Sequence, residues 1–150
     1  MLADSHGGRC GGEEVGVIAY VASSLTLRAR AQRVAAELRE AGIRVASSWH
    51  GQSTATVEAE RRLTDAERAE IAERCRDEIR TCDVLVIILG PPTTRHGSFC
   101  EAEFARHIGR RVIALRPYGA SEARGVFLAD AEEARDVDGL LRVMCGGPAR

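Results

Sequence analysis

Glu101 is the acidic residue whose surroundings best fit a role in chemistry. It follows six consecutive apolar residues, Val84 to Leu89, and a Gly90-Pro91-Pro92 stop. An apolar run of this kind is typical of a strand buried on both faces of a parallel sheet. A helical pattern begins at Ser98, so Glu101 is expected in the first helical turn, beyond the carboxyl end of the strand, where ligands of such sheets bind. Helix N-termini stabilise an ionised carboxylate by roughly 0.3–1 kcal/mol, and an ionised carboxylate can act as a nucleophile.

The same spacing also has a structural interpretation. Ser98-Phe99-Cys100-Glu101 fits a capping box, in which the glutamate bonds back to the N–H of the cap residue. Spacing alone favours this capping role over catalysis.

A group of hydroxyls occupies the junction between the first strand and the first helix. Ser23, Ser24 and Thr26, with free backbone N–H groups, could hold a nucleotide 5′-phosphate. Alternatively, Ser24 or Thr26 is an ordinary helix N-cap. The chain has no G-x-G-x-x-G or Walker sequence, so dinucleotide or triphosphate binding lacks a motif.

These residues are positioned by alternating strands and helices. The pattern predicts an α/β fold, a doubly wound parallel sheet of about five strands in a single domain over residues 15–145. We expect residues 1–14 to be a disordered leader and 146–150 a loose tail. The expected strands are 15–22, 43–46, 84–89, 112–115 and a short strand or turn at 126–128; the expected helices are 25–41, 64–81, 98–108 and 137–144, and 47–63 is expected to be irregular.

A set of spaced residues resembles the nucleoside 2-deoxyribosyltransferases and related 2′-deoxynucleoside 5′-phosphate N-hydrolase-like enzymes. The matching positions, over about residues 16 to 116, are Gly97, Glu101, Ala105, Gly109-Arg110, Val112, Asp83 and Tyr20. The chain departs from the family pattern at Glu103, where a glycine is common, at Cys75, where an aspartate contacts substrate, and at Arg95, where aspartate or serine is common.

The resemblance implies a fold, an activity and a set of site residues. It implies a flavodoxin-like strand order, 2-1-3-4-5, and cleavage or transfer at the N-glycosidic bond of a nucleoside or nucleoside 5′-monophosphate. Glu101 would form a covalent glycosyl-enzyme, with Tyr20 orienting it, and water or a second base would complete the reaction. No metal or organic cofactor is implied. Substrate-binding residues are expected at Ala22, Ser23, Ser24, Trp49, His50, Asp83, Gly90, Arg95, Gly97 and Ser98.

Several of these residues also have structural interpretations. Tyr20 could be a core aromatic, Trp49 could stack on a base or cover the sheet edge, and Asp83 could support the active-site loop. Cys75 and Arg95 favour an alternative function, a non-catalytic module of the same fold that binds a nucleotide or nucleotide signal. A third alternative is an NADase-like domain related by fold to Toll/interleukin-receptor domains.

Composition limits the possible partners. The 150 residues are 45% hydrophobic, enough for one compact domain. The net charge of −1 gives no strong attraction to nucleic acid or a membrane. All 21 basic residues are arginines that recur on polar helix faces, which is typical of solvated surfaces. The resemblance implies a homodimer, and Ala66, Ala69 and Ala72 could pack closely against a partner.

The cysteines predict the compartment. Five cysteines without a C-x-x-C pair, and no signal peptide, favour free thiols and a cytoplasmic location. Cys75 shares a helical face with Ile71 and Ile79 and is expected to be a buried, unreactive thiol. His96, Cys100 and His107 could be imagined as zinc ligands, but their spacing fits no common zinc framework.

Overall fold

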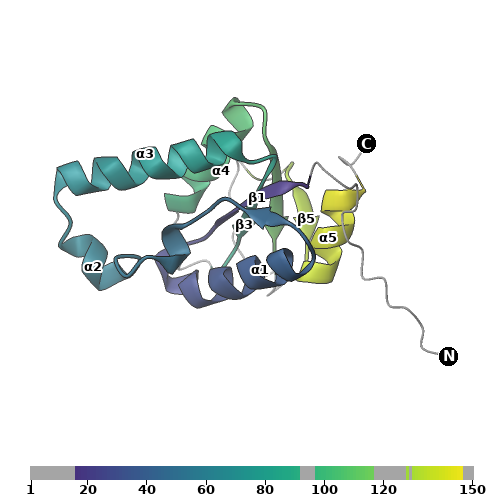
Figure 1. The fold of residues 1–150 in the computed structure, drawn as a ribbon, viewed down its shortest axis with the longest axis horizontal. Coiled ribbons are helices and arrows are strands. Elements are labelled where there is room, and N and C mark those ends of the chain that lie inside the picture. Colours follow the sequence, from purple (N-terminus) through teal and green to yellow (C-terminus); the bar gives the residue numbers. More distant parts are fainter. Residues whose placement is uncertain (1–15, 92–96, 117–127, 129, 147–150) are drawn as a thin grey trace.

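The sheet has the predicted strand order. A computed structural model describes residues 16–91, 97–116, 128 and 130–146. The predicted leader, residues 1–14, and most of the predicted tail lie outside the described residues. Five parallel strands pair in the order β2-β1-β3-β4-β5 (Figure 1). The flavodoxin-like, doubly wound fold is thus confirmed. The strands are β1 (Ile18–Ala22), β2 (Arg44–Val45), β3 (Val84–Ile88), β4 (Arg111–Leu115) and β5 (Glu132–Ala134).

Helices cover both faces of the sheet. On one face, α1 (Arg28–Glu40) and α5 (Val137–Cys145) lie side by side, and on the other α3 (Asp65–Thr81) packs beside α4 (Gly97–His107) (Figure 1). Every residue of β3 is buried, as its unbroken apolar sequence predicts for a central parallel strand. The switch in strand order falls between β1 and β3, which brings the residues after β1 next to those after β3.

The sequence of the first helix explains where the helix begins, which face it buries and where it ends. A 3₁₀ turn, η1 (Leu25–Leu27), leads into α1, whose buried stripe is Ala31, Val34, Ala35 and Leu38. Gly42 follows with φ at 89°, a left-handed conformation that favours glycine and ends the helix. The predicted helix over 25–41 is confirmed.

The segment predicted to be irregular contains two short helices. A 3₁₀ turn, η2 (Trp49–Gly51), is followed by α2 (Val57–Arg61). Thr56 caps α2 by accepting a bond from the N–H of Ala59 at 3.1 Å. This helix is too short to show an apolar period, which is why the sequence pattern missed it.

The fifth strand lies later in the chain than expected. Residues 126 and 127 of the predicted strand lie outside the described residues, and β5 occupies 132–134 instead. Glu132 and Glu133 give this strand no apolar run. They are held by ion pairs, Glu132 to Arg111 at 2.5 Å and Glu133 to Arg116 at 3.1 Å. These ion pairs to Arg111 and Arg116 hold β5 against β4, and the strand therefore needs no apolar run that a sequence pattern could detect.

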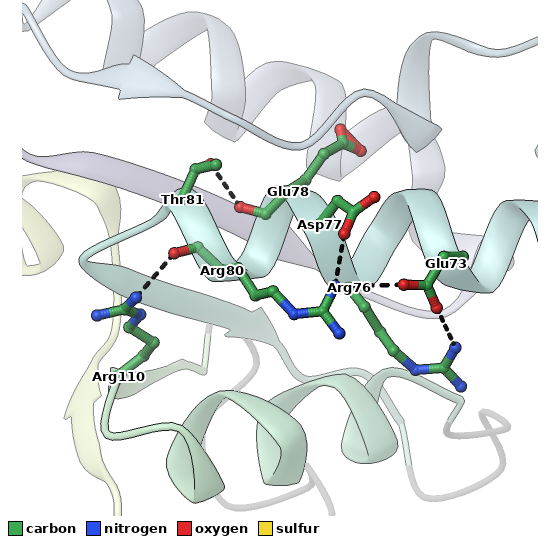
Figure 2. A network of polar contacts seen from close by, with 7 residues as sticks. All are labelled: Glu73, Arg76, Asp77, Glu78, Arg80, Thr81 and Arg110. Atoms are coloured by element: carbon green, nitrogen blue, oxygen red, sulfur yellow. Dashed lines mark hydrogen bonds and ion pairs between the residues drawn. The ribbon is translucent and has the colours of Figure 1, made fainter.

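Helix α3 is fixed at both ends. Thr64 caps it by accepting a bond from the N–H of Glu67 at 3.1 Å. At the other end, Arg110 donates to the carbonyl of Arg80 at 2.8 Å, part of a polar network between α3 and the turn after α4 (Figure 2). Arg80 also lies over the ring of Phe104 in α4. These contacts hold the two helices that carry Cys75 and Glu101.

The described residues include four of the five cysteines. Cys75, Cys82 and Cys100 are free, but Cys145 is disulfide-bonded, so the prediction of free thiols is wrong for Cys145. The sequence shows spacing only along the chain and cannot show which thiols folding brings together.

Within the described residues, no helix is long and apolar enough to cross a membrane.

Candidate functional site

A cleft of about 1050 Å³ contains most of the residues singled out for chemistry. Its wall combines the turn after β1, the segment before α2, the cleft-facing side of α3 and the first two turns of α4. This is the switch point of the sheet, where ligands of doubly wound folds bind. The predicted residues that line it are Ser23, Ser24, Thr26, Trp49, Cys75, Gly97, Ser98 and Glu101.

Glu101 lies one residue further into its helix than expected. Helix α4 begins at Gly97, so no acidic residue falls in its first turn and Ser98 is inside the helix and buried. The expected first-turn position is therefore wrong. The carboxylate oxygen Oε2 of Glu101 is buried and has no hydrogen-bond partner among the described residues. The capping-box alternative, which needs a bonded carboxylate at the helix end, does not describe this side chain.

Burial dominates the electrostatics of Glu101. The pKa of its carboxyl is raised to about 7, chiefly because burial removes solvent; the neighbouring Tyr20 hydroxyl opposes the rise, and the nearby charge of Glu78 contributes to it. The expectation that the helix end keeps this group ionised is therefore corrected. In the empty cleft, both protonation states are populated near neutral pH. Such a value is common for a group that carries chemistry.

Tyr20 and Cys75 lie beneath Glu101. Tyr20 is fully buried in β1, and its hydroxyl has no hydrogen-bond partner within the described part of the chain. Burial, with Glu101 and Cys75 nearby, raises the pKa of Tyr20 so that it stays protonated. Tyr20 is thus both a core aromatic and a neighbour of Glu101.

Cys75 is buried as predicted. Its thiol lies among apolar side chains of α3, and burial is the main cause that raises its pKa. It also lines the cleft, close to the neutral Tyr20 hydroxyl, which lowers the pKa of Cys75, and to the Glu101 carboxylate, whose charge raises it.

The hydroxyls after β1 form their own small network. Ser23 Oγ donates to the carbonyl of Ser24 at 2.9 Å, and the Ser24 and Thr26 hydroxyls lie 2.8 Å apart. Ser24 precedes η1, but its side chain makes no capping bond. The hydroxyls of Ser24 and Thr26 are partnered with each other at the cleft wall. Ala22, at the end of β1, is fully buried behind them.

Trp49 and His50 serve the scaffold. The Trp49 indole N–H donates to the carbonyl of Val21 at 2.8 Å, and the side chain is 7% exposed. Trp49 therefore packs against the end of β1 while it also lines the cleft, and stacking on a base stays a prediction. His50 is buried, with Nε2 at 3.0 Å from Ser47 Oγ, and burial lowers its pKa. It does not line the cleft.

Two expected residues, Asp83 and Gly90, do not line the cleft. Asp83 precedes β3, and its carboxylate accepts from the N–H of Ile18 at 2.8 Å, at the amino ends of the parallel strands, whereas the cleft lies at their carboxyl ends. The structure therefore does not bring Asp83 to the site. Gly90 is buried after β3 and does not line the cleft, and Arg95 is outside the described residues.

The imagined zinc set has no support in the described residues. His96 is not among them, and Cys100 lines the cleft whereas His107 ends α4. Nowhere in the described ranges do three or more His, Cys, Asp or Glu side chains gather as metal ligands would.

Sequence reasoning missed one part of the site, the arginines of α2 and α3. Arg61, Arg68, Arg74 and Arg76 all line the cleft. Their recurrence on polar helix faces was interpreted as solvation, because periodicity does not tell a solvent face from a ligand face.

Comparison with known proteins bears on the fold. No protein-family model and no curated protein matches the sequence. Among solved structures, a conserved protein from Enterococcus faecalis V583 matches with 16% identity and a TM-score of 0.60, over 85% of this chain and 96% of that one. CMP N-glycosidase BcmB from Clostridium botulinum matches with 17% identity and a TM-score of 0.51, over 85% of this chain and 97% of that one. Over that share of its length, this chain has the fold of a CMP N-glycosidase.

Proposed function

We propose that this protein cleaves or transfers at the N-glycosidic bond of a nucleoside or nucleoside 5′-monophosphate, with Glu101 as nucleophile. The observation that carries the proposal is the buried, unpartnered carboxylate oxygen of Glu101 in a cleft at the switch point of the sheet. A buried polar atom without a partner is costly to keep, and a reacting sugar would supply its partner. The fold shared with a CMP N-glycosidase supports the same class of substrate.

The chemistry proceeds by double displacement. Glu101 attacks C1′ of the sugar as the bond from C1′ to the base breaks, and the bonding electrons leave with the base. Water or a second base then attacks C1′ and releases the carboxylate, with net retention of configuration. Positive charge develops on the sugar in both steps. That charge stabilises the ionised carboxylate of Glu101 in the transition states.

The neighbours of Glu101 have supporting roles in this proposal. Tyr20 stays protonated and lies beside Glu101, so its hydroxyl can donate to the carboxylate and orient it. Ser24 and Thr26 offer hydroxyls at the opposite wall for a 5′-phosphate.

The decisive experiment compares Glu101→Gln with Glu103→Gln. Purified protein is incubated with a panel of nucleosides and nucleoside monophosphates, CMP included, and with NAD, and free base is measured. We expect base release by the parent, loss of several orders of magnitude in Glu101→Gln, and near-parent activity in Glu103→Gln, because Glu103 is exposed on the same helix and does not line the cleft. Near-normal turnover by Glu101→Gln would contradict the catalytic assignment.

The second candidate function is nucleotide binding without turnover. Cys75 favours it, because a buried neutral thiol beside the carboxylate cannot supply the charge that an aspartate would place there. Tight binding of a nucleotide by the parent protein, without release of base from any of the panel, would establish this function instead.

A further inference from the structure

The cleft carries more positive charge than a single phosphate requires. Four arginines line it, one at the end of α2 and three on α3, whereas its acidic side chains are Glu60 and Glu101. Glu101 is only partly ionised near neutral pH, because burial raises its pKa. The empty cleft is therefore cationic, although the whole chain is nearly neutral. The four are Arg61, Arg68, Arg74 and Arg76.

Two of the four arginines pair with no acidic side chain in the part of the chain that the structure describes. Arg68 pairs with Glu60 at 3.4 Å and also donates to its backbone carbonyl, and Arg76 pairs with Glu73 at 3.1 Å. Within the described residues, Arg61 and Arg74 make no ion pair and no side-chain hydrogen bond. Arg74 follows Ile71 by three residues, so the two side chains are neighbours on the surface of α3, and both line the cleft. These two guanidinium groups are available to a ligand.

The arginines are spread along the wall, not gathered at one point. From Arg68 to Arg76, α3 rises by about 12 Å. The Ser24 and Thr26 hydroxyls belong to a different wall, at the start of η1. The volume of about 1050 Å³ is at the upper end of the range of about 300–1000 Å³ for small-molecule pockets. One phosphate held at the hydroxyls would leave the arginine wall unused.

We propose that the ligand of this cleft is a nucleotide that carries two or more phosphate groups, and that the arginine wall, through Arg61 and Arg74, binds the phosphate groups beyond the first. The inference rests on the proposed function for the nucleoside part alone. Guanidinium groups match phosphate oxygens in a bidentate manner and remain charged at every physiological pH. In this cleft, arginine side chains bind the phosphate oxygens. In a glycine-rich phosphate loop, which this sequence lacks, backbone N–H groups bind them.

Calorimetry with simple anions tests the anion site without any turnover. Inorganic phosphate and pyrophosphate are titrated into the parent, into Arg61→Gln/Arg74→Gln and into Arg33→Gln. The control residue, Arg33, is exposed on α1 and does not line the cleft. We expect the parent and the control to bind pyrophosphate at least tenfold more tightly than phosphate, with the preference weakened by salt. We expect the double variant to lose that preference.

A second titration extends the test to nucleotides. The mono- and diphosphates of the four ordinary ribonucleosides are titrated into both proteins. The parent should bind each diphosphate more tightly than the matching monophosphate, and the double variant should lose this preference. Equal affinity of the parent for phosphate and pyrophosphate, or an unchanged preference in the double variant, would overturn the proposal. Because base release is measured separately on Glu101→Gln, failure of the glycosidase proposal and failure of this one give different results.

Discussion

At the scale of single residues, the state of Glu101 depends on burial, which its sequence neighbours do not reveal. The motif around it identified the residue, but the predicted first-turn position is wrong and the carboxylate is only partly ionised near neutral pH. The carboxyl pKa near 7 comes from packing of α4 against α3 and β1, which are distant in the sequence. The same holds for Trp49, whose indole N–H finds its partner in β1 only after folding.

The pH dependence of activity follows from Glu101. The nucleophile must be deprotonated, and its pKa in the free protein is about 7. If Glu101 is the nucleophile, kcat/KM for base release should rise with pH through a midpoint near 7, because kcat/KM reports groups of the free enzyme. The profile is measured from pH 5 to 9. A flat profile across that range would exclude Glu101 as the group that must lose a proton.

The buried carboxyl group of Glu101 should lower the free energy of unfolding of the protein when it ionises. Its folded-state pKa is raised above the ordinary value of 4.5, so folding is penalised once the unfolded chain ionises. The penalty is absent below pH 4.5 and complete above pH 7, where it amounts to at most about 3 kcal/mol. Glu101→Gln should therefore unfold at a higher denaturant concentration than the parent at pH 8. The two proteins should converge near pH 4, and a constant difference at both pH values would contradict this assignment.

At the scale of elements, the strength of the apolar signal decided what could be predicted. β3 and α1 could be predicted, because a continuous apolar run indicates a buried strand and an apolar stripe with a period of 3.6 residues indicates a helix. β5 and α2 did not, because β5 is held by ion pairs of Glu132 and Glu133 and α2 is shorter than two helical turns. The switch point, and with it the location of the cleft, followed from the strand order that the family resemblance implied.

Helix α3 depends on its N-cap. Thr64 accepts from the N–H of Glu67, and its hydroxyl donates to the Glu67 carboxylate at 3.1 Å. Thr64→Ala should destabilise the protein by about 1 kcal/mol, because these bonds satisfy the free end of the helix that carries Cys75. Thr64→Ser keeps the hydroxyl and should remain within a few tenths of a kcal/mol of the parent. Thermal unfolding of the three proteins measures both values, and equal stability of the alanine and serine variants would contradict a capping role.

At the scale of the whole molecule, one part of the chain extends away from the sheet. α2 and the N-terminal half of α3 reach past the sheet (Figure 1). We call residues 57–72 the arm. Its inner side lines the cleft, through Arg61, Arg68 and Ile71 among others. Val57, an apolar side chain that is 41% exposed, also lines the cleft, whereas the exposed Ala66 and Ala69 do not. A projecting arm with small and apolar exposed residues is suited to contact with a second copy.

The expected dimer can be tested through this arm. The chain has a mass of 16.2 kDa, so light scattering at micromolar concentration should report a particle of about twice that mass. Ala69→Glu should return the particle to the monomer mass, because a buried, unpaired charge at a close helix contact is strongly unfavourable. Ala36→Glu is the matched control, since Ala36 is exposed on α1, away from the arm, and should leave the mass unchanged. A monomeric parent protein would refute the dimer. A dimer that Ala69→Glu leaves intact would place the interface on a different surface and leave the arm as a wall of the cleft alone.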